Sequence, residues 1–124
     1  RKYRSGRVYG TLGYLLIQKG DLERALEYNL EGLEYDEDDP VILDNLGQIY
    51  YKIGQVDKAK DYFERAEEEK DDQAVTLYYL GLIYSQEGDK ERAREKLDKA
   101  LTCNITPLSA ITIEDIKEAL GNLD

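Results

Sequence analysis

The feature that most constrains this chain is an internal repeat with a period of 34 residues. Leu12, Leu46 and Leu80 are separated by this interval, and a glycine follows each of them. A fixed period of this length indicates an array in which one supersecondary unit stacks on the next, because a single unit cannot bury its own apolar face. Three copies are about the minimum for such an array. We therefore interpret residues 1–124 as a single domain.

Each copy has the pattern of two antiparallel helices. In the central copy, Leu43, Leu46, Gly47 and Tyr50 fall at helical spacing on one stripe, so we expect this stripe in the core. Gly54 then ends the helix, because glycine adopts the left-handed conformation without steric cost. The predicted helices span residues 7–19, 22–35, 40–53, 56–69, 74–87 and 90–102.

Glycine recurs inside the first helix of every copy, at Gly13, Gly47 and Gly81. A glycine within a helix costs roughly 1 kcal/mol relative to alanine, so its recurrence predicts a close helix crossing at each position. The first copy departs from the others in two places. Leu16 stands where they have tyrosine, and Asn29 stands where they have a large apolar residue. We therefore expect the first helix pair to be looser.

These residues resemble the tetratricopeptide repeat over about residues 6–105. The resemblance lies in the Leu-Gly pair, the aromatic residue three positions later, the Gly-Asp or Gly-Gln turn, and the small residues of the second helix. It implies an all-α fold, a right-handed α-α superhelix of three helix pairs, with repeats at about residues 6–39, 40–73 and 74–107. It also implies a concave wall, lined by the first helices, that binds a peptide or a partner's helix.

The register fails after Cys103. Thr112 has the features of a helix cap, and Ile113, Ile116 and Leu120 then fall on one apolar face. We predict a C-terminal capping helix at about residues 112–121 that covers the third repeat, as arrays require for solubility. In the alternative interpretation, Leu120 and the following glycine are the Leu-Gly pair of a delayed fourth repeat.

Charge and residue types exclude several classes of function. The net charge of -10 disfavours binding to nucleic acid, which requires Lys and Arg to neutralise phosphates. The chain has no histidine and no Gly-rich phosphate loop, and its only thiol, Cys103, has no neighbouring base. The acidic run before Pro40 lacks the alternation of a calcium loop. We therefore predict no enzyme activity, no cofactor and no metal site.

The sequence contains no apolar run of about 18 residues and no signal-peptide pattern, which predicts a soluble, cytoplasmic chain without direct membrane insertion. One feature leaves an alternative open. Four of the 17 basic residues lie within the first seven positions, as in a segment beside a membrane anchor of a larger protein. These four residues are Arg1, Lys2, Arg4 and Arg7.

The predicted binding surface is the side of each first helix that is turned away from the core stripe. It bears several tyrosines, which combine a large contact area with little rotamer entropy to lose and are therefore enriched at interfaces. Tyr9, Tyr50 and Tyr84 lie on the buried stripe and are expected in the core. The predicted groove residues are Arg7, Tyr14, Ile17, Asp44, Asn45, Gln48, Tyr51, Lys52, Tyr78, Tyr79, Leu82 and Gln86.

One subset of the tetratricopeptide family holds the acidic C-terminal tails of heat-shock chaperones with two Lys, one Arg and two Asn. By this resemblance, the five clamp positions fall on Gly10, Tyr14, Asn45, Val75 and Tyr79, of which only Asn45 matches. We therefore predict a scaffold for protein interaction that binds a neutral or mixed segment or an amphipathic helix, and no carboxylate clamp. The alternative is an architectural module that forms a homo-oligomer through its ends or its tyrosine surface.

Overall fold

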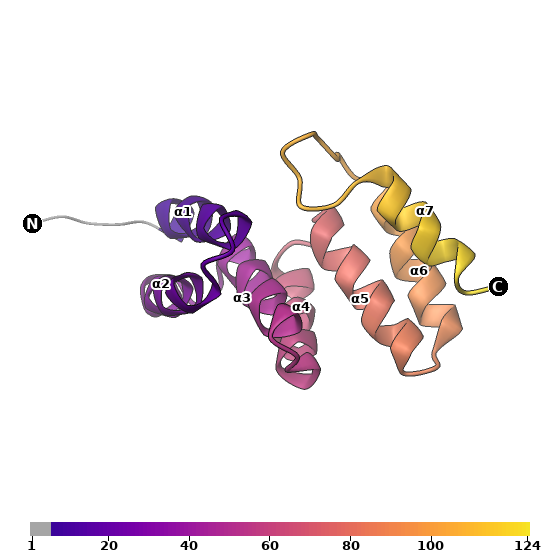
Figure 1. Cartoon of the computed structure of the whole chain (residues 1–124), viewed down its shortest axis with the longest axis horizontal. Coiled ribbons are helices and arrows are strands. Elements are labelled where there is room, and N and C mark those ends of the chain that lie inside the picture. The colour runs from indigo at the N-terminus through magenta and orange to yellow at the C-terminus, as the bar shows by residue number, and fades with distance from the viewer. Residues whose placement is uncertain (1–5) are drawn as a thin grey trace, which may run out of the picture. The chain divides into compact units, whose positions relative to one another are not determined.

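The computed structural model describes residues 6–124, with side chains from Val8 onward. These residues form seven helices and no strand (Figure 1). The all-α class is therefore confirmed, and every predicted helix end agrees with the structure to within one residue. The helices are α1 (Gly6–Gln18), α2 (Leu22–Tyr35), α3 (Pro40–Lys52), α4 (Val56–Glu69), α5 (Ala74–Gln86), α6 (Lys90–Leu101) and α7 (Ile113–Gly121).

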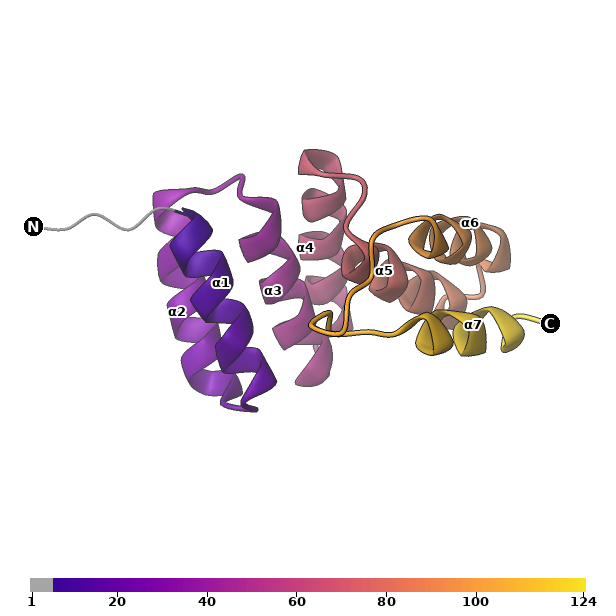
Figure 2. The ribbon, with the colours of Figure 1, turned by 90° about the horizontal axis from the view of Figure 1, so that it is seen from above.

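Contacts divide the chain into two compact units, Arg1–Glu69 and Lys70–Asp124. In the first unit, α1 and α2 form one antiparallel pair and α3 and α4 form a second, and α3 also packs against α1 and α2 (Figure 2). In the second unit, α5 pairs with α6, and α7 packs against both. The assignment of residues 1–124 to a single domain of three repeats stays a prediction.

The turns within the helix pairs form as the glycine pattern predicts. Gly20, Gly54 and Gly88 have φ angles of 84°, 89° and 85°, which is the left-handed region that glycine enters without strain. Beyond Gly54, the backbone N–H of Gln55 donates to the carbonyl of Tyr50 at 2.9 Å and closes the end of α3. Each glycine therefore stops one helix and turns the chain into the next.

The helix crossings require the internal glycines, as predicted. A Cβ atom placed on Gly47 would lie 2.6 Å from Cε1 of Phe63, which is closer than real Cβ contacts come. The large side chain of the second helix therefore rests on the bare backbone of the first. In the other copies, the corresponding distances are 2.3 Å from Gly13 to Asn29 Oδ1 and 2.6 Å from Gly81 to Leu97 Cγ.

Tyr9, Tyr50 and Tyr84 are buried, which confirms their place in the core. Leu12 differs from its counterparts in the other copies. Leu46 and Leu80 are 0% exposed, whereas Leu12 is 45% exposed. The leucine of the repeat is therefore buried in the second and third copies but not in the first, because none of the described residues covers that side of α1.

The helix after the third pair begins as predicted. The Thr112 hydroxyl accepts from the backbone N–H of Asp115 at 3.1 Å, and the Asp115 carboxylate accepts from the backbone N–H of Thr112 at 2.9 Å. Ile116 is buried against the second unit, whereas Ile113 is largely exposed, which corrects the prediction that both share the packed face. The role of α7 as the end cap of the array stays a prediction. Within residues 6–124, no helix combines the length and apolar character needed to cross a bilayer.

Candidate interaction surfaces

The first unit brings together predicted groove residues from α1 and α3. Tyr14 on α1 and Tyr51 on α3 are half-buried, and Lys52 is exposed. Asp44 and Gln48 precede Tyr51 along α3 and are buried. The basic residues Arg1, Lys2 and Arg4 and the side chain of Arg7 fall outside the described part of the chain, so no position is assigned to them.

Gln48 and Asp44 form the polar centre of this surface. The Gln48 side chain is 1% exposed, and its Nε2 donates to Asp44 Oδ2 at 2.7 Å. The other amide atom, Gln48 Oε1, is buried and has no hydrogen-bond partner among residues 8–124. Burial and the negative charge of Asp44 raise the pKa of Tyr14 above its ordinary value, so the Tyr14 phenol stays protonated. The surface thus combines a neutral phenol with an acceptor that has no donor.

The structure corrects the prediction for Ile17. This residue was expected on the groove wall, but it is buried in a cluster with Ala25 and Ile49. The reason is that its side of α1 faces α3, as the contact of Gly10 with Val41 also indicates. A Cβ atom on Gly10 would lie 2.9 Å from Val41 Cγ1. Ile17 is therefore part of the packing between the first two repeats.

Asn45 also has a structural role that the sequence analysis did not predict. Its Nδ2 donates to the Gly10 carbonyl at 2.9 Å and to Asn29 Oδ1 at 3.0 Å, and both asparagines are buried. Asn29 Nδ2 in turn donates to the Ala25 carbonyl at 2.7 Å. The amide nitrogen of Asn45 is therefore already used to join α1, α2 and α3. The signal in the sequence was Asn29 itself, a polar residue at a position where the other copies are apolar.

In the second unit, the predicted groove residues lie along α5. Tyr78 and Leu82 are half-buried, and Gln86 is exposed. Tyr79 is buried and meets Tyr78 edge to face, with ring centroids 5.3 Å apart. Tyr78 and Leu82 are thus the members of this set that combine an apolar surface with partial exposure.

A second surface lies where a basic residue near the start of the second helix of a copy meets an aromatic ring of the first helix. In the central copy, Lys58 Nζ lies 5.2 Å from the ring centroid of Tyr50. In the third copy, the Arg92 guanidinium lies 4.2 Å from the ring centroid of Tyr84 and donates to its hydroxyl at 3.0 Å. The cation therefore covers the aromatic ring in these two copies.

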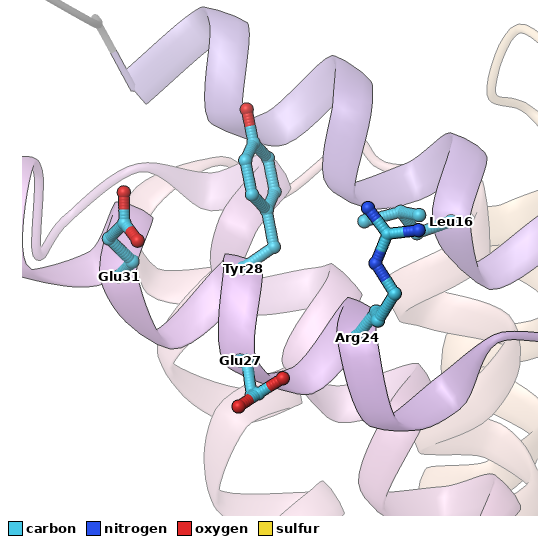
Figure 3. A pocket seen from close by; sticks show the side chains of 5 residues that line it. All are labelled: Leu16, Arg24, Glu27, Tyr28 and Glu31. Atoms are coloured by element: carbon cyan, nitrogen blue, oxygen red, sulfur yellow. The ribbon is translucent and has the colours of Figure 1, made fainter.

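In the first copy, Leu16 replaces that tyrosine, and a hollow lies beside it (Figure 3). The central copy has a hollow of about 320 Å³ at the equivalent place, beside Tyr50 and Lys58. The hollow of the first copy has a volume of about 290 Å³ and is lined by Leu16, Arg24, Glu27, Tyr28 and Glu31. Figure 3 shows Arg24 and Tyr28 reaching from α2 toward α1, whereas Glu27 points away. Asn29 is buried and hydrogen-bonded, and the expectation of a looser first pair stays a prediction.

A further hollow of about 240 Å³ adjoins the hollow of the first copy and continues along α1. No prediction from the sequence included this surface. The residues that line this hollow are Leu12, Leu15, Leu16, Lys19, Arg24 and Tyr28.

Neither surface has the residues of a catalytic or metal site. Across the described residues, no group of three or more His, Cys, Asp or Glu side chains is arranged to hold a metal ion. Burial, reinforced by the charge of Asp72, raises the pKa of the Cys103 thiol, which therefore stays protonated and weakly nucleophilic near neutral pH.

Sequence profiles described as tetratricopeptide repeat match residues 6–39 and 42–104. No curated protein matches the sequence.

Several solved structures have a similar fold. The first tetratricopeptide domain of Spaghetti (RPAP3), solved with the HSP90 peptide SRMEEVD, is 15% identical, with a TM-score of 0.75 over 96% of this chain and 90% of that domain. PilF of Pseudomonas aeruginosa is 20% identical, with a TM-score of 0.77 over 95% of this chain and 51% of PilF. YrrB, described as having an unusual peptide-binding site, is 27% identical, with a TM-score of 0.64 over 81% of this chain and 52% of YrrB.

Proposed function

Because the chain belongs to the tetratricopeptide repeat family, we propose that it is a non-catalytic module for protein-protein interaction. In this proposal, the tyrosine-bearing sides of the first helices bind a peptide segment or a helix of a partner protein. On the first unit, the contacts come from Tyr14, Gln48 and Tyr51. On the second unit, a separate set of contacts comes from Tyr78 and Leu82. The cytoplasmic location predicted from the sequence is part of the same proposal.

The observation that carries the proposal is the buried acceptor Gln48 Oε1, which has no donor among residues 8–124. A buried acceptor without a partner costs about 1 to 3 kcal/mol. Rotation of the Gln48 amide toward the surface would let an extended segment donate a backbone N–H to this atom, which would remove that cost. Tyr14 and Tyr51, both half-buried, supply apolar area and phenol groups for the same segment. The polar centre and these two rings therefore suit recognition of a peptide backbone.

The same surface is unsuited to a chain-terminal carboxylate. The Spaghetti domain was solved with the peptide SRMEEVD, which carries acidic residues at its end. By resemblance, the clamp cations of the family would fall on Gly10, Val75 and Tyr79, none of which is charged. Asn45, the matching position, already donates within the protein. We therefore propose a neutral or mixed segment as the ligand.

A display selection tests this proposal. Short random peptides would be selected on the immobilised chain, and their affinities measured by fluorescence anisotropy against the wild type and against Tyr51→Ala and Tyr78→Ala. We expect both substitutions to weaken binding while far-UV circular dichroism and thermal stability stay close to the wild type. Tyr50→Ala is the control for the core, since removing a buried aromatic residue costs roughly 3 to 5 kcal/mol.

Gln48→Leu completes the test. This substitution replaces the unsatisfied acceptor by an apolar group of similar size, so we expect the folded chain to be retained and the selected peptides to bind more weakly. Peptides that bind equally to all the groove variants would refute the groove assignment. Groove variants that unfold as readily as Tyr50→Ala would show that these rings belong to the core.

A further inference from the structure

The outer side of α1 carries a row of residues with the pattern of a buried face. Leu12 and Leu15 are 45% and 50% exposed, whereas their counterparts on α3, Leu46 and Ile49, are both 0% exposed. The row is thus apolar in both copies and is covered in only one of them. Within the first unit, this row distinguishes α1 from α3 more clearly than any other apolar surface.

The first unit also shows what covers such a row. On α3, Ile49 is buried against Ile17 and Ala25, and Leu22 and Leu26 of α2 pack against this cluster. Leu22 and Leu26 are four residues apart and therefore lie on one side of their helix. Around Ile49, the row on α3 is thus covered in part by an amphipathic helix, α2, that presents two leucines one turn apart, together with Ile17 of α1.

The charge around the row on α1 adds a second requirement. The hollow beside Leu12 and Leu15 is bordered by Lys19 and Arg24, with no carboxylate among its lining residues. The Arg24 side chain is 70% exposed, and its guanidinium lies 3.9 Å from the Asp21 carboxylate, which is a weak surface pair. Because Leu16 provides no ring to cover, Arg24 stays at the edge of the hollow. This edge is positive on a chain of net charge -10, so it favours an acidic partner.

We propose that this end face, defined by Leu12, Leu15, Leu16, Lys19, Arg24 and Tyr28, docks an acidic amphipathic helix of a partner protein. Two leucines of that helix, one turn apart, cover Leu12 and Leu15 and enter the hollow beside Leu16. Carboxylates next to these leucines pair with Lys19 and Arg24. The end face contains none of the groove residues, so this docking is independent of the proposed groove ligand.

The probe is a synthetic peptide with the sequence of residues 21–35, because this helix already covers part of the equivalent row on α3 and is itself acidic. Binding of the fluorescein-labelled peptide to the full chain would be followed by anisotropy at two salt concentrations. We expect saturable binding that weakens with salt. A peptide with Leu22→Ala and Leu26→Ala should not bind.

Substitutions on the protein locate the binding site. We expect Leu12→Gln with Leu15→Gln to lower the affinity by about tenfold or more, because two half-exposed leucines then no longer gain apolar contact. Both residues are already solvated, so the fold should be kept, as checked by circular dichroism. Leu108→Gln is the matched control, since Leu108 is 83% exposed and lies in the second unit. It should leave the affinity unchanged.

Leu16→Tyr provides a variant that should not destabilise the protein. A tyrosine here restores the residue of the other copies, occupies part of the space beside α2 and offers a ring to Arg24, as Tyr50 does to Lys58. We expect equal or higher thermal stability together with loss of peptide binding. The proposal is overturned if the peptide does not bind the wild type, or if it binds the double variant or Leu16→Tyr as well as the wild type.

Analytical sedimentation tests whether a second copy of this chain, instead of a partner helix, covers the end face. A reversible dimer of the wild type that is lost in Leu12→Gln with Leu15→Gln would assign the end face to a second copy and would overturn the proposed helical partner. A chain that remains monomeric while it binds the acidic peptide supports the proposal. Because the groove tyrosines are unchanged in every one of these variants, a negative result here leaves the groove proposal intact.

Discussion

Replacing Asn45 by alanine tests whether this amide is a structural link between the first two repeats. In the structure, Asn45 Nδ2 donates to the Gly10 carbonyl at 2.9 Å and to Asn29 Oδ1 at 3.0 Å. Both asparagines are buried, so water cannot easily replace the lost donors. Alanine therefore leaves two buried acceptors, one on α1 and one on α2, each with one hydrogen bond fewer.

The expected cost follows from these two acceptors. A typical hydrogen bond contributes about 1 kcal/mol net, and a buried group left without a partner costs about 1 to 3 kcal/mol. We therefore expect Asn45→Ala to lower the free energy of unfolding of the first unit by about 2 to 4 kcal/mol. Adding Asn29→Leu should recover part of this loss. Leucine is an acceptable partner for the crossing glycine, as Leu97 shows against Gly81, and it removes one of the unsatisfied acceptors.

Urea denaturation followed by far-UV circular dichroism measures the change, and hydrogen exchange of the amides in residues 6–69 assigns it to the first unit. Asn104→Ala, in an exposed loop of the second unit, is the matched control and should be silent. A loss below about 0.5 kcal/mol, the usual range for surface substitutions, would refute the structural role of this amide. If Asn45→Ala instead weakened a groove peptide without affecting stability, Asn45 would return to the list of ligand contacts.

Two further predictions concern packing and reactivity. Gly47→Ala should destabilise the chain by about 1 to 3 kcal/mol, because the added Cβ would lie 2.6 Å from the Phe63 ring. Gly121→Ala is the control and should not destabilise the chain, because its Cβ would meet no atom within 4 Å. Equal urea midpoints for the two variants would contradict the close crossing. Cys103 should react slowly with iodoacetamide near pH 8, because burial and then Asp72 raise the pKa of its thiol and so lower the thiolate fraction. Asp72→Asn should lower this pKa and accelerate alkylation, and an unchanged rate would exclude the carboxylate as a cause.

Much of the groove surface could be anticipated from helical spacing, but its details could not. The period identified the side of α3 on which Tyr51 and Gln48 lie, because both are set by position along one helix. The period did not identify which other helix packs against this side of α3. Ile17 and Asn45 were placed on the wall by the same reasoning, yet Ile17 packs against Ala25 and Ile49, and the Asn45 amide is hydrogen-bonded to α1 and α2. Spacing assigns a face within one helix, whereas burial also depends on which other helix lies opposite that face.

The sequence by itself determined the repeat, the helices and their turns. These features are local: apolar residues at helical spacing, a glycine that takes a positive φ, and a glycine that lets a facing side chain approach. Only the tertiary structure decided that Leu12 is exposed whereas Leu46 is buried, and that Asn29 and Asn45 bond to each other. The physical reason is that equivalent residues in a repeat have equal local conformations but different neighbours, and burial and hydrogen bonding depend on the neighbours.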